Sequence, residues 1–250
     1  MADEYRECPT VSRGIYIIGT DTDVGKTVVA AGLMHLLLKN GCRAAYFKPV
    51  ASGMTVCGGV HVSADAAFVR AVSGFAEQPD IITPFSFADA VAPHLAARLA
   101  CRRIDPAVIQ KSLNDLKNRY DVIIAEGAGG LAVPFGDEGA MQADVIRESG
   151  FPCLLVARAR LGTINHTLLT LSYAKSAGLR ICGILLNRAG ENLIEQDNIA
   201  MIKRLSGIES VFTLPVVASV DSEKMQPGRI REAFEQTINI NDMIALMGGV

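Results

Sequence analysis

The stretch of sequence that decides the fold is Gly19-Thr20-Asp21-Thr22-Asp23-Val24-Gly25-Lys26-Thr27. An apolar β-type run (residues 15–18) precedes it and an apolar helical run (residues 28–38) follows it, which is the context of a phosphate-binding P-loop. The standard pattern has four residues between its first glycine and Gly-Lys-Ser/Thr, whereas this chain has five, with Thr20 in the glycine position. The loop can still bind phosphate, because the backbone N–H groups of residues 22–26 lie at a helix N-terminus, where unpaired donors and the helix dipole favour anions.

Two side chains of this loop carry the chemistry expected of it. Lys26 is placed to reach the terminal phosphates of a nucleotide, and the Thr27 hydroxyl is placed to ligate Mg²⁺. The sequence therefore predicts a nucleoside triphosphate and Mg²⁺ as ligands, and the altered spacing is a clue to the kind of enzyme that uses them.

Length and composition limit the fold and the partners. The chain has 250 residues, of which 50% are hydrophobic and 20% are charged; this suits one large α/β domain, with two small domains as the alternative. The formal net charge of -2 argues against a general nucleic-acid partner. The 6 cysteines form no Cys-x-x-Cys pair and several lie in apolar runs, so reduced core thiols of a cytosolic protein are expected.

The beginning of the chain differs in character from the rest. Residues 1–13 are polar and acidic and contain no apolar core segment, so we interpret them as a flexible tail rather than a signal peptide, and residues 14–250 as a single domain. No apolar stretch approaches the roughly 20 residues that a membrane span needs. We therefore expect a cytoplasmic location and no membrane partner.

Apolar runs alternate with helical patterns along the chain. The runs are nearly continuous in apolar content, as in parallel strands covered on both faces, and comprise residues 15–18, 43–47, 122–125, 153–157 and 181–186. The helix candidates between them begin at a capping residue or end near a glycine, and comprise residues 28–40, 105–119, 165–177 and 192–205. This alternation predicts a doubly wound α/β fold with a mostly parallel sheet, similar to that of P-loop nucleoside triphosphate hydrolases.

Polar or glycine-rich segments follow the predicted strands, and ligands of such sheets bind beyond the carboxyl ends of the strands. Besides the P-loop, these segments are residues 48–53, 126–130, 158–165 and 187–188. Glu126 ends an apolar run and precedes Gly-Ala-Gly-Gly. In a P-loop enzyme a carboxylate here meets the metal, directly or through water, while the glycines let the backbone approach the phosphates; a capping acid before a tight turn is the alternative.

Asp65 and Lys48 are the remaining charged candidates. Asp65 lies where a helix begins, so its spacing fits either a complement to the helix dipole or a second Mg²⁺ carboxylate. Lys48 ends a strand before Pro49, which favours an extended backbone at Lys48. Its ammonium group is then expected in the same cleft as that of Lys26, giving two cations where triphosphate charge shifts during transfer; a solvated lysine is the alternative.

These segments, in this order, resemble the dethiobiotin synthetase family over residues 16–217. The markers are the P-loop, Lys48-Pro49-Val50-Ala51-Ser52-Gly53, Pro93-His94, Glu126-Gly127-Ala128-Gly129-Gly130 and Leu161-Gly162-Thr163-Ile164-Asn165-His166. The P-loop alone is shared with many ATPases, whereas its combination with the segments at 48–53 and 126–130 is specific.

The resemblance implies that 7,8-diaminononanoate, CO2 and MgATP are converted to dethiobiotin, ADP and phosphate. In that family one amine captures CO2 as a carbamate, the carbamate oxygen attacks the γ-phosphate, and the second amine displaces phosphate from the mixed carbamic–phosphoric anhydride. Such a reaction needs charge neutralisation and positioning more than covalent catalysis.

The resemblance also implies a role for each matching residue. Lys48 and Lys26 are catalytic, and Thr27, Asp65 and Glu126 hold Mg²⁺. The nucleotide phosphates are held by Asp23, Val24, Gly25, Lys26, Thr27, Val28, Gly127, Ala128 and Gly129. The base lies against Asn187, Arg188, Pro215, Val216 and Val217. The diamine is contacted by Thr22 and Ser52 and, across a homodimer interface, by Gly162, Thr163 and Asn165.

Two departures and three rival interpretations accompany this resemblance. Arg188 replaces an acid often found after the base-reading Asn, and Val216 stands where an aromatic residue can occur, so adenine selectivity is less firmly implied.

The first rival interpretation is a P-loop partitioning or metal-delivery ATPase, which often carries an additional lysine early in the loop; residues 20–22 lack one. An amide-forming synthase of cobyrinate type normally carries a glutamine-hydrolysing domain, for which this chain has no room and no nucleophile-elbow cysteine. A non-catalytic nucleotide-binding module is the third rival.

Overall fold

A central parallel sheet organises the chain. The computed structural model describes residues 12–57, 59–137, 139–222 and 224–247. The strand order is β10-β9-β8-β1-β7-β2, and every neighbouring pair is parallel. The strands are β1 (Arg13–Gly19), β2 (Ala44–Phe47), β7 (Val122–Glu126), β8 (Cys153–Arg158), β9 (Ile181–Ala189) and β10 (Val211–Pro215). The predicted fold class is thereby confirmed.

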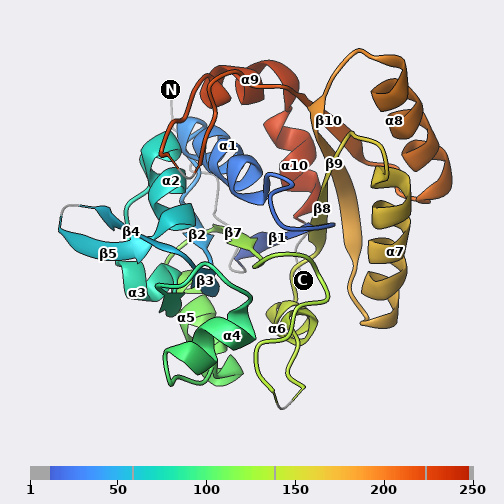
Figure 1. The fold of residues 1–250 in the computed structure, drawn as a ribbon. Helices are drawn as coiled ribbons and strands as arrows, with labels where there is room; N and C mark the ends of the chain where they lie inside the picture. The colour runs from blue at the N-terminus through green and yellow to red at the C-terminus, as the bar shows by residue number, and fades with distance from the viewer. Residues whose placement is uncertain (1–11, 58, 138, 223, 248–250) are drawn as a thin grey trace, which may run out of the picture.

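Helices cover both faces of this sheet (Figure 1). On one side lie α1 (Lys26–Lys39), α9 (Ile230–Thr237) and α10 (Ile240–Leu246), and on the other lie α5 (Pro106–Lys117) and α6 (Gln142–Ser149). Two further helices, α7 (Thr163–Ser176) and α8 (Leu193–Leu205), pack against each other beside β8 and β9. Because both faces are covered, β7 is buried along its whole length, which explains why its sequence is a continuous apolar run.

Smaller elements follow β2 and lie at its edge of the sheet (Figure 1). The parallel pair consists of β3 (Val50–Ser52) and β6 (Phe85–Phe87), and the antiparallel pair consists of β4 (Met54–Cys57) and β5 (Val60–Ser63). The accompanying helices are α2 (Ala64–Ser73), α3 (Pro79–Ile82) and α4 (Pro93–Leu99). Lys48 follows β2 directly, and Ser52 and Asp65 belong to the elements that come next in the chain, β3 and α2.

The capping residues define the helix ends. The Asp105 side chain accepts a hydrogen bond from Ala107 N (2.9 Å) at the start of α5, and Asn192 accepts one from Glu195 N (3.0 Å) at the start of α8. Two helices begin two residues earlier than expected, α1 at Lys26 and α7 at Thr163. The first turn of α1 therefore contains the lysine and threonine of the P-loop.

The sequence-based description missed part of the fold. Strand β10 is a sixth member of the sheet, and α9 and α10 lie beyond the last helix that the sequence predicts, residues 192–205. Residues 1–11 of the expected tail lie outside the described residues, and β1 begins at Arg13. Within the described ranges, none of the helices combines the length and apolar content needed to cross a membrane.

Candidate active site

The P-loop wraps around the ammonium group of Lys26. The loop joins β1 to α1 and uses positive φ angles at Asp23 (57°) and Gly25 (101°). Lys26 is 6% exposed, and its Nζ donates to the carbonyl oxygen of Asp21 (2.9 Å). The cation thus lies inside the cradle of backbone N–H groups at the N-terminus of α1, where an anion is favoured.

Four side chains meet where the P-loop enters α1: one from α1, one from α2, one from the end of β7 and one from the residue that follows β2. The Thr27 hydroxyl lies 2.9 Å from Asp65 Oδ1 and 2.9 Å from Glu126 Oε1. Lys48 Nζ lies 2.8 Å from Asp65 Oδ2 and 2.7 Å from Glu126 Oε1, and it also donates to the carbonyl oxygen of Gly127 (3.0 Å). The structure therefore brings together four of the residues that the sequence singled out. Asp65 lies in the first turn of α2 and also reaches the site, so its two interpretations are compatible.

Burial and charge set the protonation states here. Burial, together with the positive charge of the nearby Lys48, lowers the pKa of Lys26 to about 8. Burial would also lower the pKa of Lys48, but Asp65 and Glu126 outweigh it and raise that pKa above its ordinary value. Burial would raise the pKa of Asp65, but Lys48 outweighs it and lowers that pKa. Lys48 and Asp65 are consequently a charged pair at neutral pH.

The glycine segment after β7 packs against the P-loop. Ala128 N donates to Gln142 Oε1 (2.5 Å), and Gln142 Nε2 donates to the carbonyl oxygen of Gly130 (2.8 Å). Gly129 lies 3.5 Å, measured from an added Cβ, from the Thr22 hydroxyl, which is an ordinary contact distance. Its φ of 64° is a left-handed conformation that side-chain-bearing residues rarely adopt, so the turn rather than the contact favours glycine here.

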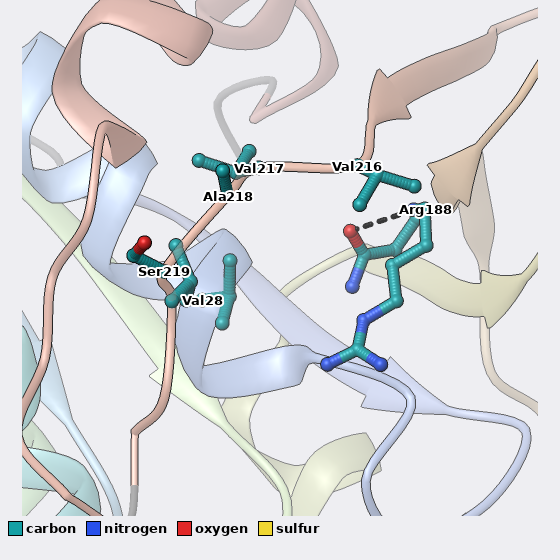
Figure 2. Close-up of a pocket in the computed structure, with 8 residues that line it drawn as sticks. Val28, Arg188, Val216, Val217, Ala218 and Ser219 are labelled. Carbon is teal, nitrogen blue, oxygen red and sulfur yellow. Dashed lines mark hydrogen bonds between the residues drawn. The ribbon is translucent and has the colours of Figure 1, made fainter.

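A pocket of about 280 Å³ lies at the ends of β9 and β10 (Figure 2). It is lined by Val28, Asn187, Arg188, Val216, Val217, Ala218, Ser219 and Val220. Asn187 Nδ2 donates to the carbonyl oxygen of Val24 (2.9 Å), and Asn187 Oδ1 accepts from Arg188 N (2.9 Å). One amide side chain thereby joins the pocket to the P-loop. Pro215 ends β10 and directly precedes the lining residue Val216.

The expected diamine residues do not all gather at the lysine–carboxylate cluster. Ser52 ends β3, four residues after Lys48 in the sequence, and Thr22 is exposed on the P-loop. Gly162 caps α7 with φ 91°, Thr163 is 4% exposed and Asn165 is exposed. Within the described ranges, no hydrogen bond or ion pair joins these α7 residues to the cluster in the same chain.

Three side chains that the sequence did not assign support the site. Tyr46 donates to Glu126 Oε2 (2.8 Å), Gln142 holds the glycine segment, and Arg158 Nη2 donates to the carbonyl oxygen of Asp23. Arg158 stands at the end of β8, so its place at a strand end was a usable signal. Tyr46 lies inside an otherwise apolar strand, so the sequence offered only its hydroxyl group as an indication that it bonds to a polar residue.

The cluster can hold a small, hard cation. Across the part of the chain that the structure describes, no three His, Cys, Asp or Glu side chains form a metal-binding group. Thr27, Asp65 and Glu126 nevertheless offer oxygen atoms around one point, with Lys48 now within hydrogen-bond distance of both carboxylates. This donor set fits Mg²⁺, which prefers oxygen and takes one or two carboxylates together with waters and substrate phosphates.

The fold and the loop define a P-loop nucleotide-binding α/β protein. A sequence profile described as an AAA domain matches residues 13–224. MinD cell division protein from Aquifex aeolicus has a similar structure (TM-score 0.61, 14% identity, 94% of this chain and 97% of that chain). The septum site-determining protein MinD complexed with Mg-ADP from Pyrococcus horikoshii also has a similar structure (TM-score 0.56, 20% identity, 96% of this chain and 100% of that chain). At these identities the likeness shows the fold alone.

Curated relatives identify the family more closely. The ATP-dependent dethiobiotin synthetase BioD of Clostridium novyi is 40% identical over 229 residues, covering 90% of this chain and 94% of the relative. The proteins of the same name from Clostridium acetobutylicum (39% over 208 residues, 82% and 87% covered) and Bacillus subtilis (36% over 213 residues, 84% and 90% covered) are similarly close. The chain belongs to the ATP-dependent dethiobiotin synthetase family, whose members are ligases.

Proposed function

We propose that this chain catalyses the ATP- and Mg²⁺-dependent carboxylation and ring closure of 7,8-diaminononanoate with CO2, producing dethiobiotin, ADP and phosphate for biotin biosynthesis. The observation that carries the proposal is the position of Lys48. Its buried ammonium group lies beside the P-loop with two carboxylates and a threonine hydroxyl, in a member of this ligase family. A phosphoryl-transfer site needs such fixed charges more than a covalent nucleophile.

Lys48 and Lys26 have distinct tasks in this proposal. One substrate amine takes up CO2 as a carbamate, a carbamate oxygen attacks the γ-phosphate, and the second amine displaces phosphate from the mixed anhydride to close the ring. Lys26, inside the P-loop cradle, holds the terminal phosphates. Lys48 stabilises the charge that moves onto the carbamate and the transferred phosphoryl group, so it matters most in the transition state.

Thr27, Asp65 and Glu126 are the proposed Mg²⁺ ligands. Two lysines and two carboxylates leave the cluster nearly neutral, so the protein alone does not neutralise a triphosphate. Mg²⁺, when bound, supplies the additional positive charge at the phosphate oxygens. Arg158 orients the loop through Asp23, and Gln142 fixes the glycine segment that faces the phosphates.

The nucleotide extends from the P-loop into the pocket of Figure 2. In the proposal, residues 23–28 and 127–129 surround the phosphates, and the base lies among Asn187, Arg188, Val216 and Val217, with Pro215 at the end of the neighbouring strand. The link from Asn187 to Val24 supports this path, because it fixes the pocket relative to the phosphate loop.

The diamine site is proposed to be shared between two copies of the chain in the cytoplasm. Thr22 and Ser52 contact the amines, and Gly162, Thr163 and Asn165 of the second copy bind the substrate carboxylate at the N-terminus of α7. Large apolar side chains are exposed around α7 and α8, including Leu161 (82%), Leu169 (61%) and Leu193 (84%). Such an exposed apolar surface is typical of a subunit interface and supports the homodimer.

Phosphate release distinguishes this proposal from a nucleotide-dependent switch. Release from ATP is expected only when the diamine and bicarbonate are both present, with dethiobiotin formed in equal amount. Hydrolysis at the full rate without the diamine, unchanged by its addition, would favour the switch and exclude the ligase. Nucleotides other than ATP, measured in the same assay, define the base preference of the pocket.

Mixed dimers test the shared site. Lys48→Ala and Asn165→Ala are each expected to be poorly active alone, but a mixed dimer contains one site with both defects and one with neither. Random mixing should therefore restore roughly a quarter of the wild-type sites. The absence of any gain on mixing, or a strict monomer by light scattering at working concentration, would contradict a site built from two copies.

A further inference from the structure

Tyr46 is a buried polar residue that the proposed mechanism does not yet use. It lies within β2, where it pairs with Ile124 of β7, and its side chain is fully excluded from solvent (0% exposed). Its hydroxyl donates to Glu126 Oε2 over 2.8 Å. The other residues of β2 are apolar, so this hydroxyl is the only polar group that the strand's side chains present.

The two oxygens of the Glu126 carboxylate have different partners. Oε2 accepts from Tyr46, whereas Oε1 lies 2.7 Å from Lys48 Nζ and 2.9 Å from the Thr27 hydroxyl. Glu126 is 0% exposed, so solvent offers no ready substitute for either contact. The terminal torsion of a glutamate is soft, which means that the side chain alone does not fix the plane of its carboxylate. The Tyr46 hydrogen bond supplies that restraint.

We propose that Tyr46 is a positioning residue for the phosphoryl-transfer site, holding Glu126 so that Oε1 faces Lys48, Thr27 and the metal–nucleotide complex. This inference rests on the proposed function, because it takes the role of Glu126 from there. Tyr46 acts through Glu126. A hydrogen-bond partner behind a metal ligand orients that ligand, and its loss typically lowers metal affinity or activity about 10–100-fold.

The chain contains a matched control in Tyr16. Tyr16 lies on β1, the other strand that flanks β7, and is also 0% exposed. Among the described residues its hydroxyl has no hydrogen-bond partner, whereas the Tyr46 hydroxyl bonds to Glu126. Tyr16→Phe and Tyr46→Phe therefore remove the same atom from equally buried rings, but only one of them removes a hydrogen bond.

The first experiment measures metal binding without turnover. Mn²⁺ is used as the probe and ADP as the nucleotide, and bound Mn²⁺ is followed by electron paramagnetic resonance for the wild type, Tyr46→Phe and Tyr16→Phe. We expect Tyr46→Phe to weaken Mn²⁺ binding in the presence of ADP by about 10-fold or more, while Tyr16→Phe matches the wild type. ADP affinity measured in EDTA should be the same in all three proteins. Equal Mn²⁺ affinities of the two tyrosine variants would overturn the proposal.

Steady-state kinetics and a second variant complete the test. The turnover number of Tyr46→Phe should fall while its KM for the diamine stays near the wild-type value, since the fully buried Tyr46 presents no surface to a substrate. In a Glu126→Gln background, Tyr46→Phe should cause no further loss in Mn²⁺ affinity beyond about two-fold; independent, multiplying losses would contradict an effect through Glu126.

A lower melting temperature with unchanged Mn²⁺ affinity would show that Tyr46 serves only the fold. If wild-type protein binds Mn²⁺ with ADP but forms no dethiobiotin, the proposed reaction fails while the tyrosine comparison still decides this inference.

Discussion

The ammonium group of Lys48 lies 2.7 Å from Glu126 Oε1, and the exposed fractions of the two side chains are 4% and 0%. The same ammonium group lies 2.8 Å from Asp65 Oδ2. A buried lysine with two carboxylate partners keeps its charge, and its place directly after strand β2 fixes it beside the phosphate loop. The site therefore has its second cation in position before any substrate arrives.

Replacing Lys48 should affect turnover far more than nucleotide binding. For Lys48→Ala we expect kcat to fall by about 10²–10³, because the lost charge acts mainly on the transition state. The dissociation constant for ADP, measured by calorimetry, should change little. Lys26→Ala is the comparison, since Lys26 lies inside the phosphate cradle and its loss should weaken ADP binding as well. Equal losses in ADP affinity and turnover for Lys48→Ala would show that Lys48 contributes to binding the nucleotide in the ground state rather than to stabilising the transition state.

The Lys48–Glu126 pair should also be visible in stability. Lys48→Met leaves a buried carboxylate with one fewer positive partner, and breaking a buried ion pair typically costs about 3–5 kcal/mol of unfolding free energy. Combining Lys48→Met with Glu126→Gln should cost less than the sum of the two single changes, as measured by urea unfolding.

An exposed ion pair provides the control for this cycle. Lys39 and Glu235 lie 2.8 Å apart with side chains 54% and 33% exposed, so their coupling should remain below about 1 kcal/mol. A coupling between Lys48 and Glu126 no larger than that of the surface pair would contradict the buried-charge explanation.

Gly25 should be indispensable for nucleotide binding. Its φ is 101°, and an added Cβ would lie 2.0 Å from Asn187 Nδ2, the atom that donates to Val24. Gly25→Ala should therefore disturb the P-loop and the base pocket together, and abolish ADP binding in calorimetry. Gly41, just beyond the other end of α1, also has a positive φ (76°), but no atom of the described part of the chain lies within 4 Å of an added Cβ. Gly41→Ala should cost only about 1–2 kcal/mol of stability from backbone strain and leave ADP affinity unchanged. ADP affinity of Gly25→Ala close to that of Gly41→Ala would contradict the proposed loop–pocket link.

Most of the sheet could be predicted because its strands are buried on both faces. Strand β10 could not, since Val211–Pro215 is an edge strand that is partly exposed and ends in a proline. Helix α9 was missed for a different reason: the ring of Phe234 packs where Gly32 has no side chain, and a Cβ there would lie 2.3 Å from the ring. Because Gly32 and Phe234 are far apart in the sequence, their packing leaves no local sequence pattern from which α9 could be predicted.

The residues of the site likewise divide into those that the sequence could predict and those that it could not. Lys48 and Glu126 were predictable because parallel strands deliver their ends to one edge of the sheet. Asp65 needed the structure, because a first-turn aspartate has an ordinary explanation in the helix dipole. Tyr46 and Gln142 act from inside a strand and from the start of a helix, where no rule of strand ends applies.

The partly buried glutamate Glu77 should make the stability of the fold depend on acid pH. Burial alone would raise the pKa of Glu77, but hydrogen bonds from Gln78 N, the Tyr120 hydroxyl and Arg119 outweigh burial and lower that pKa. Because the folded-state pKa is below the unfolded value, the stabilisation is fully present above the unfolded pKa and is lost as pH falls through the folded pKa. We expect Glu77→Gln to lower the unfolding free energy by about 1–3 kcal/mol at pH 7, as for hydrogen bonds to a charged group. The difference between variant and wild type should shrink as pH falls below about 4, where the unfolded glutamate protonates. Denaturant unfolding of both proteins across this pH range measures it, and a difference that stays constant with pH would show that the Glu77 charge contributes nothing.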